Sequence, residues 1–191
     1  MLQFQIEKKW NWNWNATTWF SSLFKWLNNE INPETGYWQR AIWNQIISKP
    51  ILNDMAGAVH FYWIYSYMNE PFPILKNLIR STINLQRTNG LYKNHPFCID
   101  LDGNYQIIHP FNQLNIKDRR MLKDHVKDSL ENNYSAILKM FIDNNLNEIY
   151  RDSHGLPGAL AALAEIKEIK LNIHTSEISN WNSIFKDVCW L

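Results

Sequence analysis

Two stretches decide the fold: Glu30-Ile-Asn-Pro-Glu-Thr-Gly36-Tyr-Trp38 and Gln86-Arg-Thr-Asn-Gly90-Leu-Tyr92. Each closes a segment whose apolar residues recur at helical spacing, and each places an aromatic residue after a glycine. A blurred copy, Asn144-Asn-Leu-Asn-Glu148-Ile-Tyr150, lacks the glycine. The copies are 54 and 58 residues apart, which is the length of a helical hairpin. Because such hairpins bury their apolar faces by stacking on neighbours, the repeat predicts an all-α array of α-hairpins.

The hydrophobic pattern predicts helices over residues 16–31, 53–68, 74–86 and 157–170. It also predicts a mixed-charge helix that begins near Asp118 and an apolar one that follows it through Phe141. The segment 53–68 is apolar nearly all round, which predicts an inner, buried helix. Residues 88–115 contain Gly, Pro and Asn throughout, so we expect a long connection there. The whole chain, 1–191, is predicted to form one domain, with an extended Trp- and Asn-rich lead-in over residues 1–15.

Composition limits the classes of partner and compartment. The chain has 191 residues, 46% of them hydrophobic, which is enough for a substantial core. A net charge of +1 gives no field that would favour nucleic acid or an anionic membrane. No apolar run approaches the roughly 18 residues of a membrane span, and neither a secretory signal nor a disulfide framework is evident. We therefore expect a soluble, cytoplasmic protein.

A helix that ends in Gln and is followed by Gly-x-aromatic resembles the QW-type repeat of the terpenoid cyclase and protein prenyltransferase superfamily. Gln86 to Tyr92 is the best copy, with Tyr where the family favours Trp, and Glu30 to Trp38 has Glu in place of Gln. The resemblance spans residues 19–165 and implies part of an α/α toroid with a hydrophobic or aromatic central pocket. A complete toroid needs about twice as many helices as predicted here, which implies an open ring, a homo-oligomer that completes it, or a remnant without activity.

The segment Asp100-Leu-Asp102-Gly103 resembles the DxDD motif of proton-initiated terpene cyclases, with Gly103 in the last acidic position. In that family the middle acid donates the proton, which implies that role for Asp102, with Asp100 beside it. The chemistry requires a carboxylic acid kept protonated by apolar surroundings and a neighbouring carboxylate. The alternative for both residues is a loop or helix-capping role.

Other candidate residues concern a pocket and a metal. If the helix over 53–68 lines a central cavity, His60, Trp63 and Tyr67 form part of its wall, and the repeat aromatics Trp38 and Tyr92 are further candidates for the lining. A core histidine with satisfied hydrogen bonds is the alternative for His60. Prenyltransferases of the superfamily bind zinc through Asp, Cys and His, but Cys98 and Asp100 stand in the reverse order. We therefore expect no metal and no cofactor.

Two classes of ligand remain open. The repeat favours an isoprenoid-like chain or a protein segment in an apolar pocket. The richness in Trp, Tyr and Asn favours a carbohydrate, as in (α/α) toroid glycoside hydrolases, lyases and epimerases, which combine carboxylates with aromatic platforms. A non-catalytic interaction protein is the third hypothesis.

Overall fold

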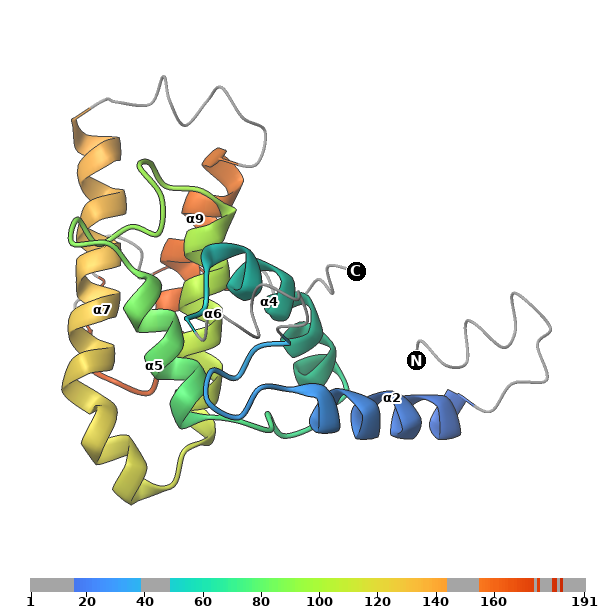
Figure 1. Ribbon diagram of the computed structural model, residues 1–191. Helices are drawn as coiled ribbons and strands as arrows, with labels where there is room; N and C mark the ends of the chain where they lie inside the picture. The colour runs from blue at the N-terminus through green and yellow to red at the C-terminus, as the bar shows by residue number, and fades with distance from the viewer. Residues whose placement is uncertain are drawn as a thin grey trace.

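The computed structural model describes residues 16–38, 49–143 and 155–173, together with 175, 180, 181 and 183. Within this part of the chain there are six α-helices and no strands, which confirms the all-α class (Figure 1). The helices are α2 (Ala16–Glu30), α4 (Leu52–Tyr67), α5 (Lys76–Leu85), α6 (Cys98–Gln113), α7 (Ile116–Ile142) and α9 (Gly155–Ile166). The predicted lead-in and the third copy of the repeat lie outside the described residues.

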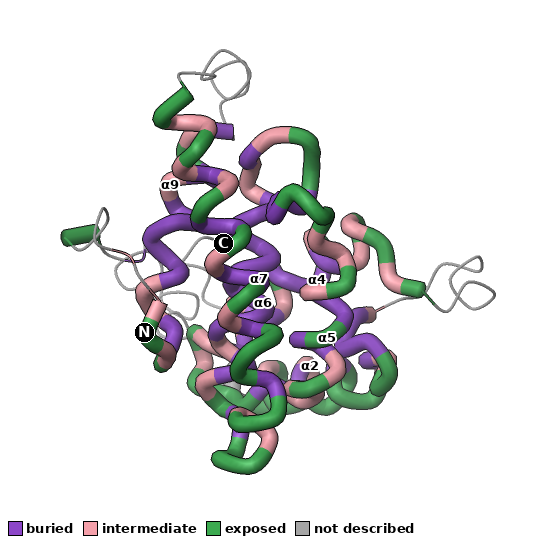
Figure 2. The backbone as a smooth tube through the Cα atoms, turned by 90° about the vertical axis from the view of Figure 1, so that its left-hand side faces the viewer, coloured by how far each residue is buried: buried purple, intermediate pink, exposed green. Residues whose placement is uncertain are grey.

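Helix α6 is the central element and contacts α4, α5, α7 and α9. Most residues of α6 between Ile99 and Phe111 are buried, and Figure 2 colours the backbone by burial. The long connection predicted over residues 88–115 is therefore wrong. A helix buried on all sides needs no polar face and shows no amphipathic period. Gly103 and Pro110, which usually mark turns, lie inside it.

Helices α6 and α9 run in the same direction. Near their first turns, the backbone of Cys98 lies against Gly158, and two turns or more further along, His109 contacts Glu165. A Cβ atom added to Gly158 would lie 2.4 Å from the Cys98 nitrogen, so the two backbones approach as closely as glycine permits. The alanine-rich face of α9 continues this close packing along α6.

Helices α5 and α7 also run parallel to each other. Lys76 pairs with Asp118 at 3.3 Å near their starts, and Ser129 Oγ lies 2.8 Å from Gln86 Oε1 where α5 ends. Helix α7 is antiparallel to α6, because the two are joined by a short turn and Asn133, late in α7, reaches back toward the start of α6. Helices α5 and α7 therefore run in one direction, and α6 and α9 run in the opposite direction.

The glycines of the repeat lie where one unit meets the next. Gly36 and Gly90 have φ values of 77° and 86°, a region that favours glycine. A Cβ atom on Gly36 would lie 2.7 Å from Leu78 Cβ in α5, and one on Gly90 would lie 2.4 Å from the Asn132 carbonyl oxygen in α7. Each turn therefore packs closely on the first helix of the following unit.

The Gln86 amide, which precedes the second turn, bonds to two backbone carbonyl groups and to one side chain. Gln86 Nε2 donates to the carbonyl oxygens of Gly90 and Ser129, at 2.8 and 3.0 Å. The Ser129 hydroxyl returns a bond to Gln86 Oε1. One side chain thus closes its own turn and fastens it to α7.

Helix α4 is less buried than the sequence suggests. It crosses α6, since its first-turn residue Met55 accepts from Gln106 while Ser66, near its end, accepts from Tyr105. Met55, Ala58, Val59, Tyr62 and Tyr65 are buried, whereas His60 is exposed. The predicted inner position is correct for one face only. None of the described helices has the length and apolarity that crossing a bilayer demands.

Substitution of Gly158 by Ala should lower the free energy of unfolding by about 1–3 kcal/mol, because the new methyl group meets the α6 backbone. Gly57→Ala is the matched control, since no atom lies within 4 Å of a Cβ there and α4 gains helix propensity. It should raise stability by about 0.5–1 kcal/mol. Urea unfolding of both variants checks this; equal effects would contradict the proposed contact.

A second prediction concerns Tyr92, whose ring lies against Gly103 and whose buried hydroxyl has no hydrogen-bond partner among the described residues. Removing the ring in Tyr92→Ala should cost about 3–5 kcal/mol. Tyr92→Phe should cost nothing or be stabilising, because it removes an unsatisfied polar atom. A loss of 2 kcal/mol or so in Tyr92→Phe would show that the hydroxyl has a partner.

Candidate functional site

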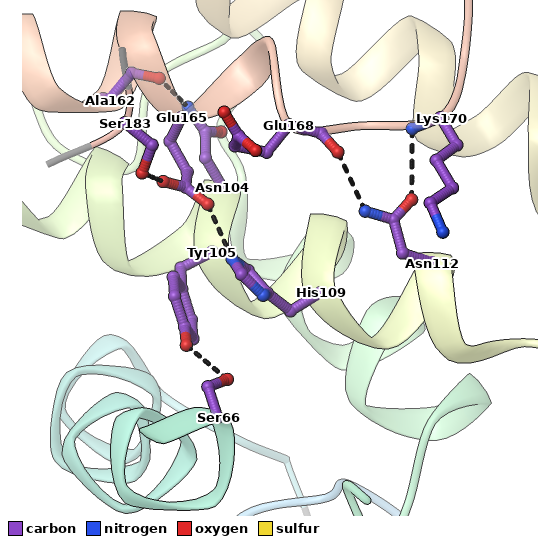
Figure 3. A network of polar contacts seen from close by, with 10 residues as sticks. All are labelled: Ser66, Asn104, Tyr105, His109, Asn112, Ala162, Glu165, Glu168, Lys170 and Ser183. Carbon is purple, nitrogen blue, oxygen red and sulfur yellow. Dashed lines mark hydrogen bonds and ion pairs between the residues drawn. The ribbon is translucent and has the colours of Figure 1, made fainter. Parts of the chain in front are cut away.

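Three side chains of α6 lie on one face. Asp102, Tyr105 and His109 are separated by three and four residues, so they follow one another along the helix. This face points between α4 and α9, because Tyr105 bonds Ser66 of α4 and His109 bonds Glu165 of α9 (Figure 3). The face therefore brings an acid, a phenol and an imidazole together where three helices meet.

His109 and Glu165 form a close pair with a 2.7 Å separation between Nε2 and Oε1. The Glu165 side chain is fully buried, while that of His109 is 28% exposed. Ser183 Oγ donates to the second carboxylate oxygen at 2.6 Å, so both oxygens of Glu165 are satisfied. A buried carboxylate bonded to one ring nitrogen fixes the orientation of the imidazole and leaves its other edge toward solvent.

Aromatic rings extend from this pair onto α4. Tyr105 stacks on His109 with ring centres 3.9 Å apart, and its hydroxyl donates to Ser66 Oγ at 2.6 Å. Trp63 meets Tyr105 edge to face at 6.2 Å, and His60 meets Trp63 at 4.8 Å. We call His60, Trp63, Tyr105 and His109 the ring row; it connects the exposed surface of α4 to the buried Glu165.

Asp100 caps the start of α6. Its carboxylate accepts from the backbone nitrogens of Phe97 and Tyr92, at 2.9 and 3.2 Å, and from Asn133 Nδ2 at 2.8 Å. Burial raises the pKa of Asp100 above its usual value, although these hydrogen bonds act in the opposite direction. Asp100 therefore has the helix-capping role that was the alternative to acid catalysis. It lies in the first turn of a helix and not in a loop.

Asp102 is in a different environment. Asp102 is 7% exposed, and its carboxyl group has no hydrogen bond or ion pair with the described residues. Burial, followed by the nearby charge of Asp100, raises its pKa from 3.8 to about 8, and Lys93 only partly opposes this. Asp102 is therefore mostly protonated at neutral pH, as a carboxylic acid that donates a proton must be.

The other predicted pocket residues are separated by the fold. Tyr67 is 42% exposed at the end of α4. Trp38 packs on Phe61 and Tyr62 with ring centres 5.0 and 5.2 Å apart, and its Nε1 donates to the Leu27 carbonyl. Tyr92 lies in the core. Trp38 thus packs between α2 and α4, and Tyr92 packs against Gly103 of α6, whereas His60 and Trp63 belong to the ring row.

The described residues contain no group of three or more His, Cys, Asp or Glu side chains placed to hold a metal ion. Sequence reasoning missed Tyr105 and Glu165 as site residues. The available signal was the i, i+3, i+7 spacing of Asp102, Tyr105 and His109, which is evident only once residues 98–113 are assigned to a helix.

A separate hollow of about 710 Å³ lies beside α2 and the end of α4. It is lined by aromatic, amide, hydroxyl and charged side chains: Phe20, Ser21, Phe24, Lys25, Asn28, Asn29, Met68 and Glu70. The Tyr65 hydroxyl donates to Asn28 Oδ1 at 2.6 Å and so holds that amide in place. This hollow combines apolar and polar side chains, which is the composition of a ligand site.

Comparison of the chain with protein-family models, with curated proteins and with solved structures finds no match.

The pKa of Asp102 predicts how stability depends on pH. Between pH 4 and pH 8 the folded protein holds a proton that the unfolded chain has released, so stability falls as pH rises. The slope is at most about 1.4 kcal/mol per pH unit. Asp102→Asn cannot titrate, so its free energy of unfolding relative to wild type should increase steadily across this range.

Urea unfolding at several pH values between 4 and 9 measures the difference. Asp124→Asn, a change at an exposed position of α7, is the matched control and should follow the wild-type curve. Parallel curves for Asp102→Asn and wild type would mean that Asp102 ionises normally.

Proposed function

We propose that this protein is an enzyme that transfers protons to an apolar, isoprenoid-like ligand, with Asp102 as the proton donor. The observation that carries the proposal is the state of this carboxyl group. It is nearly buried, it has no partner among the described residues, and its pKa is raised to about 8. A structural aspartate normally gains hydrogen bonds when buried, as Asp100 does, whereas an acid catalyst needs its proton retained and available.

The neighbouring carboxylate supports this role. Asp100 keeps three hydrogen bonds and stands two residues before Asp102. A negative charge held there makes ionisation of Asp102 less favourable, and it is the second cause of the raised pKa. The two carboxyl groups therefore have different roles, as in other acid catalysts with paired carboxylates. Asp100 is held by hydrogen bonds, and its presence makes Asp102 less ready to ionise.

The His109–Glu165 pair supplies a proton acceptor on the same face. Asp102 and His109 are seven residues apart, which separates their Cα atoms by about 10 Å along the helix. Glu165 holds one nitrogen of the imidazole, so the partly exposed edge of the ring is the one available to a ligand. Asp102 and His109 thus place a donor and an acceptor on one face of α6, with Tyr105 between them.

We further propose that the helices form part of an α/α toroid. The support is the alternation of two parallel pairs, α5 with α7 and α6 with α9, and the use of Gly36 and Gly90 where successive units meet. In this arrangement α4, α6 and α9 are the inner helices. A second copy of the chain would then complete the ring.

A carbohydrate ligand is the second candidate. The hollow beside α2 favours it, because Phe20 and Phe24 offer ring surfaces while Asn28 and Asn29 offer amide donors and acceptors. This hollow is not lined by Asp102 or by His109, so a sugar bound there would not be positioned for the acid–base chemistry proposed above.

Thermal unfolding of the purified chain with farnesol, squalene and a panel of oligosaccharides separates the candidates. We expect an isoprenoid to stabilise both the wild type and Asp102→Asn. We also expect Asp102→Asn to form no product. Product is followed by mass spectrometry. Asp124→Asn, which alters an exposed aspartate of α7, should keep both properties. Full turnover by Asp102→Asn would exclude the acid role, and stabilisation by oligosaccharides alone would favour the second candidate.

A further inference from the structure

Three lysine side chains line a second hollow of about 300 Å³, away from the face of α6 described above. Lys123 and Lys127 come from α7, and Lys170 follows α9, with Leu171 and Asn172 completing the lining. Lys123 and Lys127 are four residues apart and so point to the same side of α7. Three positive charges therefore meet in one small hollow of a chain whose net charge is only +1.

The positive charges are poorly compensated within the part of the chain that the structure describes. Lys127 pairs with Glu131 at 3.7 Å, a long separation between two side chains that are each 40% exposed. Such a surface pair contributes little stability, so a stronger anion can displace it. Lys123 and the Lys170 ammonium have no ion pair with the described residues. Like charges around one hollow repel one another, and a bound anion reduces that repulsion.

The backbone holds the third lysine in position. The Lys170 nitrogen donates to Asn112 Oδ1 at 3.1 Å, and Asn112 Nδ2 donates to the Glu168 carbonyl at 2.9 Å (Figure 3). Asn112 belongs to the central helix α6, so the segment after α9 is fixed to the core. The backbone on one side of the hollow is therefore held by α6 at Lys170.

We infer that this hollow binds a phosphate-bearing ligand, with Lys123, Lys127 and Lys170 around the phosphate oxygens. A carboxylate carries one negative charge and two oxygens, whereas a phosphate monoester carries about two charges and three terminal oxygens. Three ammonium groups match the larger charge, and lysine acts as a point charge toward phosphate. Leu171 offers an apolar contact for the organic part of the ligand. A soluble phosphate ester and a lipid headgroup share this chemistry.

Nuclear magnetic resonance titration with inorganic pyrophosphate tests the inference. Saturable shifts of the backbone amides of Lys170, Leu171 and Asn172 are expected. Lys123→Gln and Lys170→Gln should each weaken binding about three- to fivefold, and the double variant about tenfold or more. Lys139→Gln removes the same charge from an exposed position of α7 outside the hollow and should leave the affinity unchanged. Absence of saturable shifts, or an equal loss in Lys139→Gln, would overturn the inference.

Vesicles of phosphatidylcholine with and without phosphatidic acid distinguish the two sources. Binding to phosphatidic acid vesicles that Lys170→Gln weakens supports the site and assigns a headgroup. Pyrophosphate binding with no association to either vesicle supports the site and assigns a soluble ester. Vesicle binding that persists in the double variant would overturn the inference, because the contact would then lie elsewhere. These readouts do not involve Asp102, so they stand apart from the proposed catalysis.

Discussion

A helix that is buried on all sides and yet carries amide and acid side chains must find a partner for most of them in its neighbours. Helix α6 meets this requirement with bonds to three helices. Asn104 donates to Asn133 of α7 and to the Ala162 carbonyl of α9, and Gln106 donates to the Met55 carbonyl of α4. Since a buried amide without partners costs about 1–3 kcal/mol, these bonds select one arrangement of the surrounding helices. The apolar contacts would allow several.

The same constraint sets Asp102 apart. Asp100 accepts three hydrogen bonds, and the amide nitrogens of Asn104 and Gln106 have partners although their amide oxygens have none among the described residues. The Asp102 carboxyl group makes no hydrogen bond or ion pair with the described residues. Loss of solvent without a compensating bond favours the neutral acid, so the raised pKa follows from the packing that organises the fold. Stability and reactivity are linked here, because any change that opened a water path to Asp102 would lower its pKa.

Sequence reasoning predicted the features that depend on local chemistry. The helix class, and the ends of helical segments before Gly36 and Gly90, follow from spacing and from residue type. It failed for residues 98–113, because a fully buried helix loses the amphipathic period on which such predictions rely. The pairing of His109 with Glu165 joins residues on different helices, and no local pattern contains that contact. The toroid and the ligand stay predictions.

The parallel direction of α6 and α9 has an electrostatic consequence. Their first turns lie side by side at Cys98 and Gly158, so the positive ends of the two helix dipoles add instead of cancelling. Asp100, in the first turn of α6, faces this field, and the first turn of α9 has no acidic residue. The charges that act on Asp100 therefore include the dipoles of peptide groups, which no count of charged residues contains.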